Sequence, residues 1–176
     1  MNIIAFAGSN SKTSINKKLV TYAADLLDLN VKIIDFNDCD IPLYSINIEK
    51  ENGFSNGVEN LFDIIKKADI ILVSFAEHNA SFTAELKSNM DWCSRINPKF
   101  LEDKKIFAMS TSPGGYGGKN ALDAGVSLFK KFGGEVLETF SLPKFNDNFS
   151  DNQITNEEFD LELKNKIEKF KAEILE

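Results

Sequence analysis

Apolar strands and amphipathic helices alternate five times along this chain, and that alternation limits the possible folds more than any other feature. Five short segments are mostly apolar on both faces, which is typical of buried strands; they are Asn2–Ala7, Val31–Phe36, Ile70–Phe75, Lys105–Ser110 and Glu135–Leu142. Other segments repeat apolar residues at helical spacing; they are Ser14–Leu29, Asn56–Lys67, Ala84–Ile96, Lys119–Phe132 and Glu157–Leu175. The pattern predicts an α/β fold with a parallel sheet covered by helices on both faces.

The number of strands narrows the topology. Right-handed crossovers between parallel strands lead to a three-layer α/β/α sandwich. Five strands favour the flavodoxin-like order 2-1-3-4-5 over a six-stranded Rossmann sheet. The 176 residues contain no internal repeat, low-complexity segment or linker, so we expect one domain spanning residues 1–176.

The composition excludes several classes of function. The chain has 27 acidic and 20 basic residues and a net charge of −7, which disfavours binding to nucleic acid or anionic lipid. His78 and Arg95 are the only residues of their kinds, so one chain can form neither a metal site with two histidines nor an arginine cluster. There is no membrane-spanning run or signal-peptide pattern, and Cys39 and Cys93 match no zinc or C-x-x-C spacing. We therefore expect a cytoplasmic protein with two free thiols, no metal, and no membrane or nucleic-acid partner.

A polar loop follows the first predicted strand, at the sheet edge where open parallel sheets bind ligands. It is Gly8–Asn16 (GSNSKTSIN), which has four hydroxyls and Lys12 ahead of a helix that Ser14 is expected to cap. Backbone N–H groups and the helix dipole favour an anion at such a place. The loop matches neither a Walker A motif nor a dinucleotide-binding glycine motif. It fits either a bound phosphate monoester or a turn that only caps the helix.

Two further loops are expected at the same edge. Ala76–Thr83 (AEHNASFT) follows the most clearly buried strand and contains Glu77, His78 and Asn79. Ser110–Gly118 (STSPGGYGG) follows the fourth strand, and its four glycines would let the backbone approach a flat ligand closely. Each loop by itself is also compatible with an ordinary solvated surface loop.

Together the three loops resemble the NADPH-dependent FMN reductases of flavodoxin-like fold, a family that includes quinone, azo-dye and chromate reductases. Gly8–Leu19 follows the family pattern G-S-x-R-x-x-S-x-N-x-x-L except that Ser11 stands in place of arginine. Ala76–Arg95 resembles P-E-Y-N-x-S followed by L-K-N-x-x-D-W-x-S-R, with alanine for the proline and His78 for the tyrosine. Ser112–Gly118 matches S-x-G-x-x-G-G.

The resemblance implies a bound FMN and a set of residues that would hold it. The phosphate would lie against Ser9, Ser11, Ser14, Ile15 and Asn16. The isoalloxazine ring would have Ala76, Glu77, His78 and Asn79 along one edge and Ser112, Pro113, Gly114 and Gly115 on the other side. NADPH or NADH would supply the hydride, and a quinone, azo compound, free flavin or similar small molecule would accept it. Members of the family are usually homodimers or homotetramers.

The cofactor carries the redox chemistry in such an enzyme, so no catalytic side chain is required. His78 is a candidate proton donor to a reduced quinone, or a packing or interface residue. Trp92 is predicted to pack in the core or at an interface, and Cys93 to be a buried thiol. Arg95 fits a pair with a neighbouring subunit, a contact with the cofactor phosphate or a solvated helix end. Two alternatives remain open at this point. One is an FMN-binding electron-transfer or sensing module without NAD(P)H turnover. The other is a flavin-free relative, which the serine at position 11 motivates.

Overall fold

Five parallel strands form the centre of the computed structural model, which describes residues 1–176. They lie in the order β2-β1-β3-β5-β6, with bounds Val31–Ile34, Ile3–Ala7, Ile70–His78, Lys105–Thr111 and Glu135–Leu142. The two-residue strand β4 (Ser81–Phe82) pairs antiparallel with the end of β3 and stands outside this series. Without β4, the order is the predicted 2-1-3-4-5, so the flavodoxin-like fold is confirmed.

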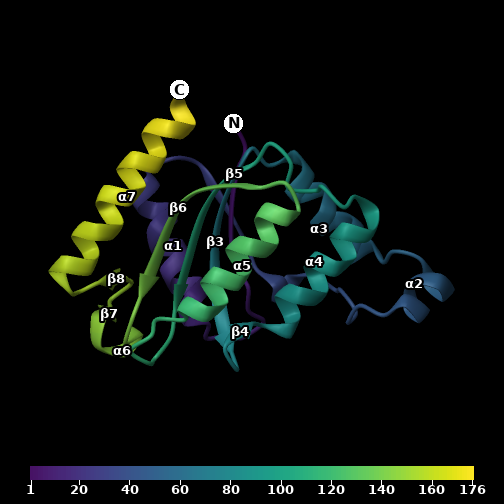
Figure 1. Cartoon of the computed structure of the whole chain (residues 1–176), viewed down its shortest axis with the longest axis horizontal. Coiled ribbons are helices and arrows are strands. Elements are labelled where there is room, and N and C mark those ends of the chain that lie inside the picture. The colour runs from purple at the N-terminus through teal and green to yellow at the C-terminus, as the bar shows by residue number, and fades with distance from the viewer.

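Helices cover both faces of the sheet, as Figure 1 shows. Helices α1 (Ile15–Leu27) and α7 (Glu157–Leu175) pack on one face. On the other face lie α3 (Asn56–Lys67), α4 (Ala84–Ile96) and α5 (Lys119–Lys131). The predicted three-layer sandwich is therefore confirmed. Both chain termini lie at one end of the molecule, opposite β4 and the short helix α6 (Phe145–Asn148).

Successive strand residues enter opposite cores, because side chains alternate across a strand. In β1, Ile3, Ala5 and Ala7 belong to the core under α1 and α7. Ile4 and Phe6 belong to the core under α3, α4 and α5. This explains why apolar residues occur at successive positions of the sequence. Parallel register then brings the carboxyl ends of β1, β3 and β5 to one edge, with Ala7 opposite Ser74 and Ala76 opposite Thr111.

Several short elements lie outside the predicted pattern. They are the 3-10 turn η1 (Phe36–Asp38), α2 (Ile46–Asn52), β4, α6, β7 (Phe149–Ser150) and β8 (Gln153–Ile154). These elements are too short to show an apolar periodicity, and tertiary contacts stabilise them. Helix α2 is one case, because Glu49 within it accepts two hydrogen bonds from Nε of Arg95 on α4, at 3.0 and 3.1 Å. The three-residue extension of β3 beyond Phe75 is another, because it pairs with β5 and β4.

A partly exposed ion pair joins α1 to the end of β2. The Asp35 carboxylate accepts hydrogen bonds from Nζ of Lys17 and from the backbone N–H of Asn37. These hydrogen bonds, with Lys17 the largest cause, lower the pKa of Asp35 to about 2. The side chain of Asp35 is 22% exposed to solvent. Because the folded pKa is depressed, the resulting stability is present above the ordinary carboxyl pKa and is lost as pH falls toward 2.

We predict that Asp35→Asn lowers the free energy of unfolding at pH 7 by roughly 1–2 kcal/mol and has little effect near pH 2. Asparagine keeps the hydrogen bond to Asn37 but loses the charge that Lys17 pairs with. Urea denaturation followed by the fluorescence of Trp92, the single tryptophan, measures this at both pH values. Asp38→Asn is the matched control, since Asp38 is exposed and forms no ion pair. An equal loss at pH 7 and pH 2 for Asp35→Asn would contradict the assignment.

Candidate functional site

A shallow cleft of about 270 Å³ lies at the carboxyl ends of β1, β3 and β5. It is lined by Ser9, Ser11, Thr13, Ser14, Ile15, Asn16, Ala76, Glu77, His78, Thr111, Ser112 and Pro113. The three predicted loops therefore meet in one place. Of the residues that the sequence places at the site, only Asn79, Gly114 and Gly115 do not line the cleft.

The first loop turns into α1 through hydroxyl groups. Ser14 caps the helix as predicted, with its Oγ accepting from the N–H of Lys17 at 3.2 Å. Ser9 Oγ accepts from the N–H of Ser11, and Ser11 Oγ accepts from the N–H of Thr13. The hydroxyls thus do shape the turn, which was one of the two interpretations. In these bonds the hydroxyl oxygens are acceptors. The hydroxyl hydrogens of Ser9 and Ser14 therefore form no hydrogen bond within the protein.

Two backbone donors at the start of α1 have no acceptor within the protein. They are the N–H groups of Ile15 and Asn16, the first two residues of α1. The first N–H groups of any helix lack an intrahelical partner. Here they line a cleft, and Asn16 is only 3% exposed. Free N–H groups at the positive end of a helix dipole form an anion site, so the phosphate interpretation is compatible with the capping one.

Gly8 and Thr83 fix this loop to α4. A Cβ on Gly8 would lie 2.8 Å from a methyl carbon of Leu86, so a larger residue at position 8 would have to displace this side chain. Thr83 Oγ1 donates to the carbonyl of Gly8 at 2.8 Å and accepts from the N–H of Leu86. Thr83 was not among the predicted site residues. Its position directly before the predicted helix Ala84–Ile96 is the signal that could have found it.

The second loop is largely a β-hairpin, which the sequence did not predict. His78 pairs with Ser81, and Asn79 and Ala80 form the two-residue turn between them with φ of 51° and 60°. Both angles are left-handed, as a type I′ turn requires. Such turns usually contain glycine, and the segment NA has none, so the hairpin signal was weak. Asn79 therefore lies at the hairpin tip, while His78 remains exposed on the rim of the cleft.

The Glu77 carboxylate stabilises the start of α5. Its Oε2 accepts a hydrogen bond from the N–H of Ala121 at 3.0 Å. The residue at the N-cap of α5 is Gly118, which has no side chain to cap the helix. Glu77 thus supplies the missing acceptor from a neighbouring strand and places negative charge at the positive end of the helix dipole. This contact ties the second loop to the third.

Only part of the glycine-rich loop is free to approach a ligand. A Cβ on Gly117 would lie 2.4 Å from Ser141 Oγ, and both Gly117 and Gly118 have positive φ, so packing and conformation require them. Gly114 and Gly115 have no protein atom closer than 3.8 Å to a Cβ. The N–H of Lys144 donates to the carbonyl of Gly114 at 2.9 Å and anchors the loop. The predicted close approach of a flat ligand is therefore possible at Gly114 and Gly115.

The remaining singled-out residues serve the fold. Trp92 is 1% exposed and its Nε1 donates to the carbonyl of Pro42 at 2.7 Å, so its packing role is confirmed. Arg95 pairs with Glu49 of its own chain, a partner that none of its three predicted alternatives named. Burial raises the pKa of the Cys93 thiol to about 12. Burial and neighbouring carboxylates also raise the pKa of Cys39, so neither cysteine supplies a reactive thiolate.

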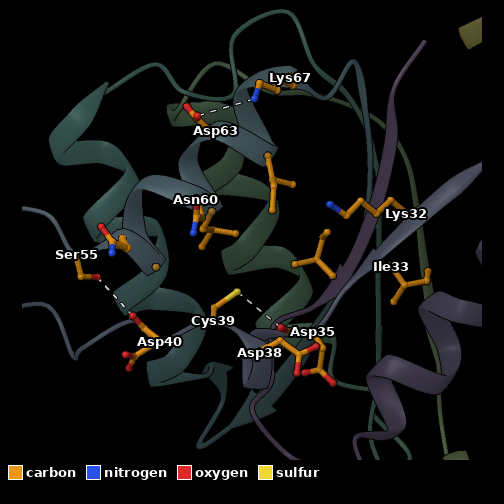
Figure 2. Close-up of a pocket in the computed structure, with 15 residues that line it drawn as sticks. Lys32, Ile33, Asp35, Asp38, Cys39, Asp40, Ser55, Asn60, Asp63 and Lys67 are labelled. Carbon is orange, nitrogen blue, oxygen red and sulfur yellow. Dashed lines mark hydrogen bonds and ion pairs between the residues drawn. The ribbon is translucent and has the colours of Figure 1, made fainter.

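A larger cavity of about 780 Å³ lies between β2 and α3 (Figure 2). Its lining includes the carboxylates of Asp35, Asp38, Asp40 and Asp63, against two lysines. This balance of charge repels a phosphate. The cavity also lies beyond the outer edge of β1, whereas parallel sheets bind ligands where the strand order reverses, between β1 and β3. Size alone therefore does not identify the site.

No three histidine, cysteine, aspartate or glutamate side chains come together in a way that could hold a metal ion. None of the helices has the length and apolar character needed to span a membrane.

Comparison with known proteins identifies the family. The sequence model of the NADPH-dependent FMN reductases matches residues 1–172. This chain belongs to that family. It is 28% identical over 149 residues to a quinone reductase of Escherichia coli K12, covering 78% of this chain and 79% of that protein. It is 35% identical over 121 residues to an NADPH:quinone oxidoreductase of Arabidopsis thaliana, covering 67% of this chain and 61% of that protein.

Solved structures agree on the fold. The flavoenzyme NAD(P)H:(acceptor) oxidoreductase FerB of Paracoccus denitrificans superposes with a TM-score of 0.78 at 20% identity, over 97% of this chain and 95% of that one. The chain is thus an FMN-dependent NAD(P)H oxidoreductase by family. Its own residues fit FMN, because the unpartnered N–H groups of Ile15 and Asn16 suit a phosphate and no protein atom crowds a Cβ position at Gly114 or Gly115.

Proposed function

We propose that this reductase binds FMN in the cleft at the carboxyl ends of β1, β3 and β5 and uses NADPH or NADH to reduce a quinone. An azo compound or free flavin is a further candidate acceptor. The single observation that carries the proposal is the N-terminus of α1, where the N–H groups of Ile15 and Asn16 lack protein acceptors beside the cleft. A helix start of this kind binds a phosphate that stays in place.

In this proposal, the residues predicted from the sequence contact different parts of the cofactor. Ser9, Ser11 and Ser14 hold the phosphate with their hydroxyls, and Ile15 and Asn16 hold it with backbone N–H groups. Ala76, Glu77 and His78 run along the ring with backbone groups, and Ser112 to Gly115 support its other side. When bound there, FMN would supply the hydride-transfer chemistry between the nicotinamide and the acceptor. The chain supplies position and electrostatics, which is why it needs no nucleophile.

His78 is the group that this proposal assigns to proton delivery. Its imidazole is exposed at the rim of the cleft, where a reduced quinone would take up a proton. Imidazole is the side chain suited to proton transfer near neutral pH. The cleft is also small for a cofactor site. We therefore propose a homodimer or homotetramer in which a second copy covers the flavin ring. We place the protein in the cytoplasm.

The test of the function is steady-state oxidation of NADPH, and separately of NADH, by FMN-loaded protein with benzoquinone as acceptor. We expect flavin absorbance that stays with the protein through gel filtration, and quinone-dependent turnover. Bound flavin without turnover would instead support an electron-transfer module. Failure of added FMN to bind at all would support a flavin-free relative. Either result would contradict the proposal.

We predict that Ile15→Pro weakens FMN binding about tenfold and leaves riboflavin binding nearly unchanged, because it removes one phosphate-facing N–H. Proline is tolerated at the first helical position, and Ser14 has the extended backbone (ψ 118°) that a residue before proline needs. Quenching of flavin fluorescence measures both affinities.

Asn56→Pro is the matched control for this variant. Asn56 is the first residue of α3, follows a serine cap with ψ of 158°, and lines the larger cavity of Figure 2. It should leave FMN affinity unchanged. The opposite pattern, with Asn56→Pro impairing FMN binding and Ile15→Pro not, would move the phosphate site to that cavity.

A further inference from the structure

We propose that Asn16 is a positioning residue, whose side-chain amide fixes the start of α1 against β3 and β5 and so holds the phosphate-binding N–H groups in place. The proposal rests on the proposed FMN site and changes the role of one residue in it. Asn16 then acts on the phosphate through the helix backbone, not through its amide.

The amide of Asn16 forms three hydrogen bonds with the sheet. Its Oδ1 accepts from Ser74 Oγ at 2.8 Å and from the N–H of Thr111 at 3.0 Å. Its Nδ2 donates to the carbonyl of Thr111 at 3.1 Å. The side chain therefore bonds both backbone groups of the last residue of β5, as a neighbouring strand would. These three partner groups belong to Ser74 on β3 and Thr111 on β5, which lie 58 and 95 residues from Asn16 in the sequence.

Burial gives these bonds their effect. Asn16 is 3% exposed, and Ser74 and Thr111 are fully buried. Hydrogen bonds shielded from water are strong and leave few alternative arrangements. Because Asn16 belongs to the first turn of α1, the same residue presents its own unpartnered N–H to the cleft. The orientation of that N–H and the neighbouring one is set by the amide.

The same bonds connect the first loop to the third. Thr111 is followed directly by Ser112 and Pro113, which line the cleft. Thr111 Oγ1 also donates to the carbonyl of Leu142 at 2.7 Å, which anchors the end of β5 to β6. Because Leu142 holds Thr111 independently of Asn16, loss of the Asn16 amide frees the phosphate-binding turn of α1 and leaves the start of the glycine-rich loop anchored to β6.

The test compares FMN with riboflavin, which lacks the phosphate, in Asn16→Ala, Ser74→Ala and the double variant. We expect Asn16→Ala to weaken FMN binding at least about tenfold while riboflavin binding changes less than about twofold. Ser74→Ala, which leaves Asn16 in place, should weaken FMN binding about two- to fivefold. In the double variant Ser74→Ala should add nothing, because Ser74 acts only through Asn16.

Fluorescence quenching of the flavin gives the affinities without turnover, and urea denaturation confirms that each variant is folded. Asn60→Ala is the matched control. Asn60 is an exposed helical asparagine that lines the cavity of Figure 2, and the variant should bind both flavins normally.

Should Asn16→Ala fail to fold, Ser74→Ala still decides whether Asn16 has the positioning role. A normal ratio of FMN to riboflavin affinity in Ser74→Ala overturns the positioning role, as does an equal loss of both flavins in Asn16→Ala. If the unmodified protein binds neither flavin, the proposed function fails first and this inference falls with it.

Discussion

The site depends most on the hydrogen bonds that the Asn16 amide forms with Ser74 and Thr111. Parallel pairing brings the ends of β1, β3 and β5 to one edge, but it does not orient the helix that starts there. The buried amide does this, since it joins the first turn of α1 to two strands at once. The Glu77 carboxylate performs a comparable task for α5. Polar side chains beneath the cleft thus place two helix starts, and the cleft takes its shape from them.

This arrangement explains how the chain can lack the arginine found in the family pattern. Ser11 stands at that position and uses its Oγ to accept from the N–H of Thr13. A side chain of that size shapes the turn but adds no charge. The N–H groups of Ile15 and Asn16 and the dipole of α1 do not depend on the side chain at position 11. In the proposed site, phosphate recognition through the backbone would therefore tolerate the substitution.

The fold could be predicted from the sequence because two-sided burial of the strands leaves a clear apolar pattern. The three site loops could be located for the same reason, since each follows a buried strand. The β3–β4 hairpin could not, because Asn79 and Ala80 adopt left-handed angles without the glycine that signals such a turn. Nor could the contact between Glu77 and Ala121, which lie 44 positions apart and are marked by no local pattern. The place of Thr83 before the predicted helix Ala84–Ile96 indicates a cap, but it does not indicate the hydrogen bond to the carbonyl of Gly8, 75 positions away.

The most direct test of the account is the change in backbone amide proton shifts when FMN and, separately, riboflavin are added to ¹⁵N-labelled protein. Hydrogen bonding to a phosphate shifts the donor proton downfield. The account predicts that the largest downfield changes occur at Ile15 and Asn16 with FMN and are absent there with riboflavin. Largest changes at Asn56 and Gly57, which begin α3 beside the cavity of Figure 2, would contradict it.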